Sequence, residues 1–463
     1  MLDVVLIAVN APHPANVLAG VSYRATPLGT AYLGAALARA GFRTALIDMN
    51  AAPCPSDWVV RFAAAQRPPL IGLSCATESA GNAVRLARRL RAALPETLLV
   101  TGGPHWTFLP AMALADGLFD AVAVREGEDT IVELAQVACG GGDLSRVAGL
   151  ALPGPAGGDG TVRRTAPRPL VADLDTLPFP ARDLFVPVVA GNQASVLTGR
   201  GCPGRCAFCA AAAMSGGRRR VRSAENVVAE LAELRGAGVE GVFFVDDTLT
   251  ADPARLERLL DLMEAARLGL AWVCESRSDT VSLPLLRRMS DLGCVSVQFG
   301  VESGSQALLD AMGKDITLGQ VERAVGWASA AGLSPVCSFI IGHPWDTEDT
   351  IADTVEFAAG LQTRHLARCG FALLVPFPGT RLWRRGDELG LRRLTDDFDH
   401  YNMHTPVCAT ARLGPERLRT LQFGAVRRLA AETGEAMSAM LPFRGAGGGA
   451  DHSLAAGLWR DWY

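Results

Sequence analysis

The sequence predicts an α/β protein with two sheets of parallel strands and a small, mostly helical C-terminal region. The first sheet is expected to be doubly wound and Rossmann-like, and the second to form a partial (β/α)6 barrel of the TIM type. Short apolar runs alternate with helical stretches in both halves of the chain, which is typical of parallel sheets covered by helices. The expected boundaries are residues 1–138, a linker at 139–193, the barrel at 194–385 and the remainder at 386–463.

The first series of apolar runs predicts five strands, at residues 4–9, 44–48, 70–74, 98–101 and 121–124. Helices are expected between them, for example over residues 30–40 and 80–93. Ligands of doubly wound sheets bind at the carboxyl ends of the strands. The loops at those ends are Asn10–Pro14, Ser74–Thr77, Gly102–His105 and Arg125–Glu128. Because glycine lacks a Cβ, Gly102 and Gly103 would let a large flat ligand approach the backbone.

The linker is rich in glycine and proline. Residues 153–160 contain two prolines and four glycines and predict the tip of a hairpin. The prolines within residues 177–183 favour an extended connector.

The second series of runs predicts six strands, at residues 195–198, 241–245, 270–274, 295–301, 335–341 and 371–375. A partial barrel carries its chemistry at the carboxyl ends of these strands, as full barrels do. The polar and charged residues in or after these strands are Asp246, Asp247, Glu275, Arg277, Glu302, Lys314 and Ser338. Each of them alone could belong to a structural ion pair, but their positions at successive strand ends indicate a binding site.

Three cysteines, Cys202, Cys206 and Cys209, form a C-x3-C-x2-C array after the first strand of the second series. Thiolates at this spacing suit an iron–sulfur cluster, and a cubane cluster usually takes four of them. Three would leave one iron open to a small molecule. A structural zinc site is the alternative, but it needs four ligands, and no histidine follows Cys209 within sixty residues. An odd number of cysteines argues against a disulfide framework.

The three cysteines, with Phe208 before the last, resemble the signature of the radical S-adenosylmethionine (SAM) enzymes. The resemblance implies a [4Fe–4S] cluster whose open iron binds the amino and carboxylate groups of SAM, and one-electron cleavage of SAM to a deoxyadenosyl radical. It also implies that the ribose, amino and carboxylate groups of SAM contact several strand-end residues. Those positions are Phe208, Asp246, Asp247, Glu275, Arg277, Glu302, Lys314, Ser338 and Ile340. Arg277 could instead be a surface residue or a substrate clamp.

The first domain resembles the cobalamin-binding domain that is fused to one large radical SAM subgroup. The motifs are Pro27–Leu33, then Gly102–His105, then Glu126–Glu128. The positions that the resemblance assigns to cobalamin are Asn10, His13, Pro27, Leu28, Gly29, Ser74, Thr77, Gly102, Gly103, Pro104, His105, Glu126 and Gly127. The fingerprint Asp-x-His-x-x-Gly is absent, so the lower axial ligand stays open; His13 is the nearest candidate, and an exposed loop histidine is its alternative. A nucleotide-like fold that binds nothing is the alternative for the whole domain.

The net charge of −4 is too small to indicate a nucleic-acid partner, and the basic run Arg218–Arg220 is interpreted as solvated surface. The start of the chain lacks the basic region of a signal peptide, and no apolar run reaches the length of a membrane span. Cys75, Cys274, Cys294 and Cys337 lie in or beside apolar strands and are expected to be core residues. Scattered cysteines favour a reducing cytoplasm.

The expected function is cobalamin-dependent radical SAM methylation of carbon in a small molecule, with a natural product as the expected substrate and a flavodoxin- or ferredoxin-type protein as the reductant. Radical dehydration, decarboxylation or ring rearrangement without methyl transfer is the second hypothesis. A cobalamin or redox sensor without turnover is the third. Such a sensor would need the cluster but not Glu302, Lys314 and Ser338, whose joint presence argues against it.

Overall fold

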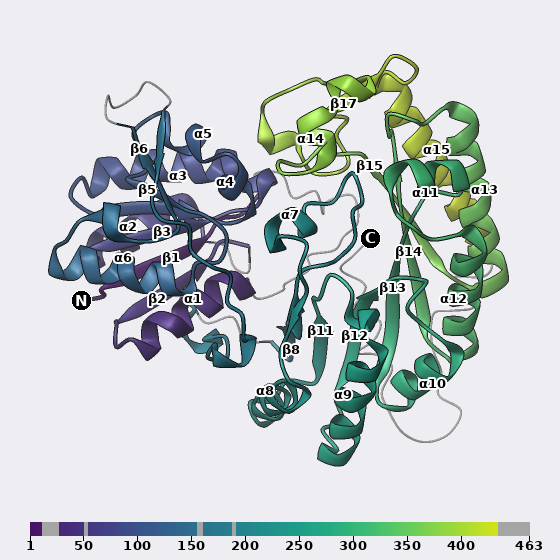
Figure 1. The fold of residues 1–463 in the computed structure, drawn as a ribbon, viewed down its shortest axis with the longest axis horizontal. Coiled ribbons are helices and arrows are strands. Elements are labelled where there is room, and N and C mark those ends of the chain that lie inside the picture. The colour runs from purple at the N-terminus through teal and green to yellow at the C-terminus, as the bar shows by residue number, and fades with distance from the viewer. Residues whose placement is uncertain (12–26, 51–53, 155–160, 188–190, 434–463) are drawn as a thin grey trace. The chain divides into compact units, whose positions relative to one another are not determined.

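The computed structural model describes residues 1–11, 27–50, 54–154, 161–187 and 191–433. His13 and residues 155–160 of the expected hairpin tip lie outside the described residues. The chain divides into two units (Figure 1). Unit 1 contains Met1–Pro14, Arg24–Gly191 and the short segment Asp397–His400, and unit 2 contains the other residues.

Unit 1 is built on a sheet with the strand order β2-β1-β3-β4-β5-β6-β7. Strands β1 to β5 run parallel to one another, and β6 and β7 add an antiparallel pair at one edge. The strands are β1 (Val4–Ala8), β2 (Thr44–Asp48), β3 (Leu70–Ser74), β4 (Leu98–Gly102), β5 (Ala121–Ala123), β6 (Leu150–Pro153) and β7 (Val162–Arg164). The predicted doubly wound, Rossmann-like sheet is thereby confirmed.

Helices cover both faces of this sheet. On one face α1 packs against α6, and on the other α2 packs against α3. The bounds are α1 (Leu28–Arg39), α2 (Ser56–Gln66), α3 (Ala80–Ala93), α4 (Pro104–Phe108), α5 (Pro110–Leu114) and α6 (Glu128–Gly140). Leu6, Leu46 and Leu70 of the strands and Leu37 and Leu134 of the helices are buried in the core between α1, α6 and the sheet. Burial of these apolar side chains is the main force that joins the layers.

The segment after α6, which was expected to be a linker, packs as part of unit 1 up to Gly191. Strands β6 and β7 extend the sheet. Further along, the backbone N–H of Ala181 donates to the carbonyl of Ala31, and that of Val186 donates to the carbonyl of Leu46. The proline-rich connector is therefore fixed against α1 and β2.

Unit 2 is built on a curved sheet of six parallel strands in the order β8-β11-β12-β13-β14-β15. The strands are β8 (Gln193–Val196), β11 (Gly241–Phe244), β12 (Ala271–Ser276), β13 (Cys294–Glu302), β14 (Ser334–Ile341) and β15 (Arg368–Leu373). Figure 1 shows the helices on the outer side of the sheet, as in a barrel. These helices are α8 (Ala224–Gly236), α9 (Pro253–Ala266), α10 (Leu283–Asp291), α12 (Leu318–Ala330) and α13 (Glu348–His365). The partial barrel is confirmed, and the four predicted core cysteines are buried.

The described part of the C-terminal region, residues 386–433, contains a long helix and a short antiparallel pair of strands. The expected helix is present as α15 (Pro415–Thr433), which packs on α13 and β15. It is preceded by a short helix, α14 (Arg381–Arg385), and by an antiparallel pair, β16 (Leu391–Arg393) and β17 (Cys408–Thr410). These three-residue strands show no clear alternation of polar and apolar residues, so neither strand was predicted. Among the described residues no helix is both long and apolar enough to cross a membrane.

Candidate functional site

The cysteine loop of unit 2 leaves β8 and is closed at its base by a two-stranded ribbon. Strand β9 (Gly199–Arg200) pairs antiparallel with β10 (Arg220–Val221), and α7 (Ala211–Ser215) lies between them in sequence. Gly201 has a φ of +93°, and a Cβ there would lie 2.3 Å from the carbonyl oxygen of Arg218. Only glycine fits such a position. The ribbon therefore holds together the two ends of the segment that carries the cysteines.

The middle of the loop is fixed by two backbone hydrogen bonds. The N–H of Ala207 donates to the carbonyl of Met312 at 2.8 Å, and the N–H of Leu382 donates to the carbonyl of Ala207 at 3.1 Å. Ala207 is itself buried. The loop is thus held in place by α14 on one side and by the end of α11 (Gln306–Met312) on the other.

The thiol of Cys202 lies beside Gly204, whose backbone N–H donates to its Sγ at 3.4 Å. A Cβ at Gly204 would lie 3.2 Å from Sγ of Cys202 and 3.9 Å from Sγ of Cys206, so a larger residue there would crowd the thiol of Cys202. In the described part of the chain, no three His, Cys, Asp or Glu side chains converge as the ligands of a single metal ion would. In a cubane each cysteine binds a different iron atom. The three cysteines remain the predicted ligands of a cubane cluster.

The register of the sheet gathers several polar side chains on its inner face. Glu275 pairs with Gln298, and Gly300 pairs with Ser338. Since residues alternate between faces along a strand, Gln298 and Gly300 share a face, as do Ser338 and Ile340. The opposite face carries the apolar core, including Phe299 and Phe339.

Gln298 is a polar residue on this face that the sequence analysis missed. It is buried, and its Oε1 has no hydrogen-bond partner among the described residues. A buried polar atom without a partner is uncommon in a folded protein. The signal was present in the sequence, because Ser296, Gln298 and Gly300 alternate with apolar residues along β13.

Glu302 and Lys314 form a buried ion pair at the end of β13. Nζ of Lys314 donates to Oε1 of Glu302 at 2.7 Å, and both residues are under 10% exposed. Burial alone would lower the pKa of Lys314, but the carboxylate of Glu302 outweighs it and the pKa lies above its usual value. A Cβ at Gly300 would come within 2.6 Å of this carboxylate and 2.9 Å of the ammonium. The absence of a side chain at Gly300 thus makes space for the pair.

Two further charged residues surround the pair. Burial, together with the carboxylates of Asp247 and Glu302, raises the pKa of Glu275 to about 7. Arg277 forms a bidentate ion pair with Asp279 and donates from Nη2 to the carbonyl of Lys314 at 2.9 Å. Arg277 therefore has a structural role in holding the backbone that carries Lys314.

The adjacent carboxylates Asp246 and Asp247 differ in their surroundings. Asp246 is buried and accepts from the backbone N–H of Thr198 at 2.9 Å and from its hydroxyl at 2.7 Å. Arg255 donates to the carbonyl of Thr198 at 2.9 Å. Asp247 is exposed. Asp246 thus ties the end of β8 to the end of β11, while Asp247 is the one available to a ligand.

His343 follows β14 and has no exposed surface. Neither ring nitrogen has a partner among the described residues, and burial lowers its pKa to about 3. Its ring lies edge-on to Phe208, with 5.8 Å between the centroids, and stacks on Trp345. Asp346 accepts two backbone N–H groups of this turn, from Gly342 and His343. His343 is therefore a neutral, buried residue that packs against the ring of Phe208.

In unit 1 the predicted cobalamin residues lie at the carboxyl edge of the parallel strands. Gly103 precedes α4 with a φ of +98°, and a Cβ there would lie 2.5 Å from the carbonyl oxygen of Cys75 and 3.3 Å from Oγ of Ser74. The loops after β3 and β4 thus meet at a point where only glycine fits. The residues that the structure places at this edge or in the first turn of α1 are Asn10, Pro27, Leu28, Gly29, Ser74, Thr77, Gly102, Gly103, Pro104, His105, Glu126 and Gly127.

Two of these residues are held by contacts within unit 1. Oε2 of Glu126 accepts from the backbone N–H of Val171 at 2.8 Å. The carbonyl of Asn10 accepts from Nδ2 of Asn82 at 3.0 Å. Both contacts fix the loops of the edge.

His105 is buried at the same edge. Its Nδ1 lies 3.2 Å from the hydroxyl of Thr77, and its Nε2 has no partner among the described residues. Burial lowers its pKa to about 4, so the ring is neutral at physiological pH. The rings of Trp106 and Phe398 each lie edge-on to it, at 4.4 Å between centroids. Phe398 belongs to the segment Asp397–His400, which Asp399 anchors through an ion pair with Arg85 at 2.7 Å.

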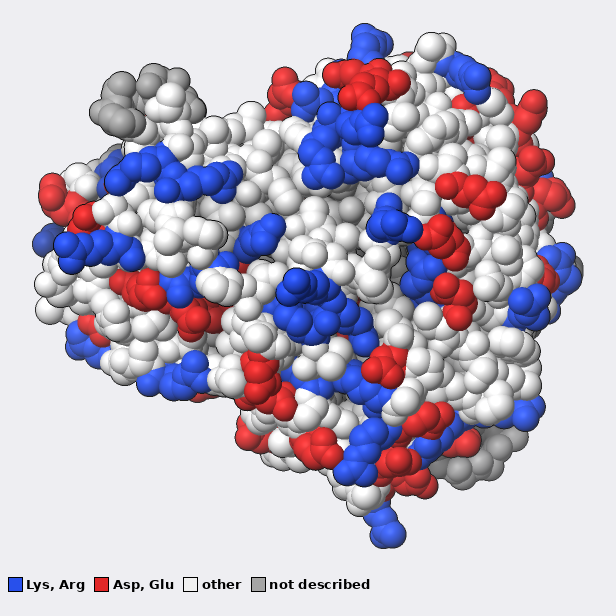
Figure 2. Space-filling view, viewed as in Figure 1, with Lys and Arg blue, Asp and Glu red and all other residues white. Residues whose placement is uncertain are grey.

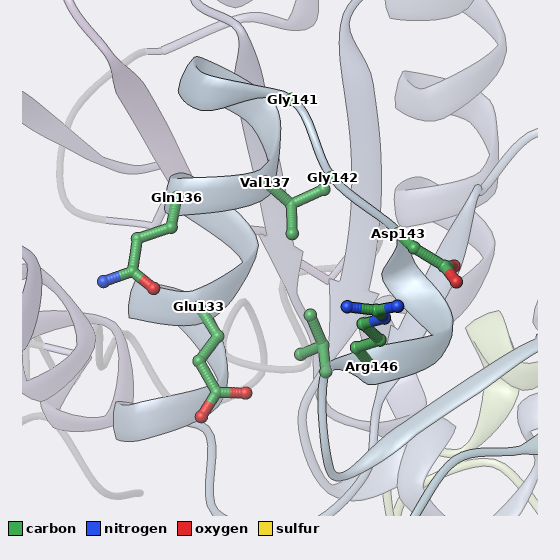
Figure 3. Close-up of a pocket in the computed structure, with 8 residues that line it drawn as sticks. Glu133, Gln136, Val137, Gly141, Gly142, Asp143 and Arg146 are labelled. Carbon is green, nitrogen blue, oxygen red and sulfur yellow. The ribbon is translucent and has the colours of Figure 1, made fainter.

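A shallow pocket of unit 1 lies away from this edge. Figure 3 shows Glu133 and Gln136 of α6, with Gly142, Asp143 and Arg146 beyond its carboxyl end. A second hollow beside it is lined by Arg39 and Arg168 among others. Since the helices of such a fold run antiparallel to its strands, the end of α6 lies at the amino edge of the sheet. Neither pocket contains a residue predicted to bind a cofactor.

Comparisons with known proteins give the class of the two domains. The radical SAM superfamily matches residues 196–358, and the B12 binding domain matches residues 15–135. An uncharacterized methyltransferase of Pyrococcus horikoshii is 32% identical over 402 residues, which cover 85% of each chain. An anaerobic magnesium-protoporphyrin IX monomethyl ester cyclase of Rubrivivax gelatinosus is 25% identical, over 82% of this chain and 69% of its own.

The fold is shared with a solved structure. The radical SAM methyltransferase TsrM of Kitasatospora setae, with cobalamin and a [4Fe–4S] cluster bound, superposes with a TM-score of 0.74 at 20% identity. The match covers 94% of this chain and 92% of TsrM. The two domains are thus those of an enzyme that combines radical SAM chemistry with a B12-binding fold. The chain belongs to the cobalamin-dependent radical SAM methyltransferase family, and its cofactors are a [4Fe–4S] cluster, SAM and cobalamin.

Proposed function

We propose that this enzyme methylates a carbon atom of a small molecule, with SAM as the source of the methyl group and cobalamin as its carrier. The relative at 32% identity is named as a methyltransferase, which supports methyl transfer. A natural-product substrate and a place in the cytoplasm complete the proposal. All eleven cysteines lie in the described residues and none of them forms a disulfide, which supports a reducing compartment.

The observation that carries the proposal is that the cysteine loop lies beside a group of acidic and basic side chains at the carboxyl ends of the strands. When bound, the cluster and SAM supply one-electron cleavage of a carbon–sulfur bond and a radical that abstracts hydrogen, and cobalamin supplies the methyl group. In our proposal Cys202, Cys206 and Cys209 bind three irons of the cluster. The chain's other residues then bind and orient SAM, which fixes the reacting groups in one geometry.

The roles of these residues follow from their charges. Glu275, Asp247 and Glu302 provide acceptors for the ammonium and ribose hydroxyls of SAM, and Lys314 provides a cation for its carboxylate. Ser338, Gln298 and Ile340 line the inner face beside them. Phe208 and Ile340 both pack against the apolar cluster that contains Ala207. Asp246 and Arg277 act as supports, because their side chains already bind Thr198 and Asp279.

The carboxyl edge of unit 1 is the proposed cobalamin site. The neutral ring of His105, with one unpartnered nitrogen, and the close backbone approach at Gly103 are the features that fit a large flat ligand. Because His105 is only 1% exposed and covered by two aromatic rings, we propose that it lines the site rather than binds cobalt.

The test uses the anaerobically reconstituted protein with reductant, SAM and hydroxocobalamin. The expected result is cobalamin that stays bound through gel filtration, together with S-adenosylhomocysteine and deoxyadenosine as products. Deoxyadenosine without bound cobalamin would eliminate the methyltransferase proposal while leaving radical SAM chemistry in place.

That second outcome corresponds to the other candidate function, a radical rearrangement, dehydration or decarboxylation without methyl transfer. The similarity to a protein named as a cyclase, over 82% of this chain, supports this second candidate function. In that case deoxyadenosine should form without S-adenosylhomocysteine.

Gly103→Ala should weaken cobalamin binding. A Cβ at this position would overlap the carbonyl oxygen of Cys75, and the positive φ is unfavourable for alanine, so the loops after β3 and β4 must separate. We expect at least a tenfold loss of affinity in a titration followed by absorbance, an order of magnitude that corresponds to about 1.4 kcal/mol. Gly140→Ala is the matched control, because a Cβ there meets nothing within 4 Å. Equal affinity of the two variants would contradict the assignment.

A further inference from the structure

A group of arginines surrounds the cysteine loop on the surface of unit 2. Arg205, Arg218, Arg381 and Arg384 are exposed, and we call them the arginine patch. None of the four forms an ion pair with a described carboxylate within 4 Å. The sequence has no Asp or Glu between Asp183 and Glu225, or between Glu356 and Asp387. Figure 2 shows Lys and Arg side chains gathered over the region where Figure 1 draws α7 and α14. The whole chain has a net charge of −4, so this positive surface is local.

The patch lies directly against the loop that holds the cysteines. Arg205 stands between Cys202 and Cys206 in sequence, and its carbonyl lies 3.4 Å from where a Cβ of Gly313 would be. Nη2 of Arg381 donates to the carbonyl of Ala311 at 3.0 Å, beside the same turn.

The other two members of the patch are equally near. The carbonyl of Arg218 lies beside Gly201, the residue before Cys202. Arg384 is on α14, which binds the loop through Leu382 and Ala207. A protein that covers the patch would therefore rest on the loop itself.

We propose that the arginine patch is the docking surface for a small acidic one-electron carrier protein of the ferredoxin type. This inference rests on the proposed function, which needs one electron delivered to the cluster. A reduced carrier loses one electron and the cluster gains it; no bond forms or breaks and no proton moves. Exposed cations with no carboxylate partner favour an acidic protein partner, since charge complementarity speeds and orients association.

The test measures binding rather than turnover. The probe is an oxidised, acidic plant-type [2Fe–2S] ferredoxin, titrated by calorimetry into the cluster-loaded protein without SAM or substrate. Arg218→Glu/Arg384→Glu is compared with Arg287→Glu/Arg323→Glu, which reverses two exposed arginines on α10 and α12. We expect the Kd of the first variant to rise at least about tenfold, and that of the control to change less than about twofold. Raising the salt from about 50 to about 300 mM should weaken binding to the wild type.

The outcomes separate this inference from the proposed function. Equal Kd values for the two variants, or no binding to the wild type at low salt, would overturn the docking surface. Reduction of the cluster by dithionite, seen by electron paramagnetic resonance in both variants, shows that their clusters are intact. A wild-type protein that binds no cluster would instead refute the proposed function.

Discussion

Cys202→Ala is expected to abolish the formation of deoxyadenosine from SAM. Removal of one thiolate leaves a cubane with two protein ligands instead of three, and such a cluster is lost or cannot present a single open iron to SAM. Iron and sulfide per chain should fall, and deoxyadenosine should stay at the level of a reaction without enzyme. The measurement is chromatography of the products after anaerobic incubation with dithionite and SAM.

Cys139→Ala is the matched control for this variant. Cys139 is an exposed thiol at the end of α6 in unit 1, outside the cysteine loop, so its loss should leave cluster content and deoxyadenosine formation unchanged. Deoxyadenosine from Cys202→Ala at a rate near that of the wild type would show that the cluster has been assigned to the wrong residues.

Lys314→Met should destabilise the fold and weaken SAM binding together. The ammonium of Lys314 and the carboxylate of Glu302 are buried at 2.7 Å from each other, and removal of one partner of a buried pair typically costs about 3–5 kcal/mol. The remaining carboxylate would be left without its cation. Chemical denaturation of the apoprotein measures the first effect, and equilibrium binding of SAM to the cluster-loaded protein measures the second.

The double variant Glu302→Gln/Lys314→Met separates structure from ligand binding. Because both charges are removed, most of the lost stability should return. SAM affinity should stay at least about tenfold below that of the wild type, since the groups proposed to bind it are gone. Recovery of SAM affinity along with stability would show that the pair is structural only.

The alternation of residue types along a strand predicts which side chains share a face of the sheet. Along β13, Ser296, Gln298 and Glu302 alternate with apolar residues, with a glycine at position 300, and that period of two is enough to say that the strand has one polar face. It does not say which polar residue of which neighbouring strand lies beside each one. That depends on the register, which pairs Glu275 with Gln298 and Ser338 with Gly300.

The partners of the charged residues could not be predicted for the same reason. Asp246 and Arg277 stay predicted SAM contacts, but their partners within the protein were not predicted: Asp246 binds Thr198, 48 residues earlier, and Arg277 binds Asp279 and the backbone of Lys314. A strand-end position brings a side chain to the right edge of a sheet. Which hydrogen-bond or ion-pair partner the side chain then contacts depends on distances of a few ångströms, and these are set by the packing of the neighbouring elements.

The contacts of the segment Asp397–His400 are the clearest example of what the sequence could not predict. It stands more than two hundred residues after unit 1 in sequence, but Phe398 packs on His105 and Asp399 pairs with Arg85. Three polar residues around one phenylalanine carry no local signal for such a contact, because the apolar area that drives it is supplied by a distant part of the chain.

By itself, the sequence determined the two parallel sheets and the three-cysteine loop, since both depend on residues that are close together along the chain: apolar runs at the period of a strand, and thiols spaced to wrap one cluster. The tertiary structure alone decided the partners, namely those of the Glu302–Lys314 pair, the rings around the buried His105, and the arginine patch. Those features form where residues distant in sequence meet, and their energies come from burial and charge in a shared environment that no local pattern contains.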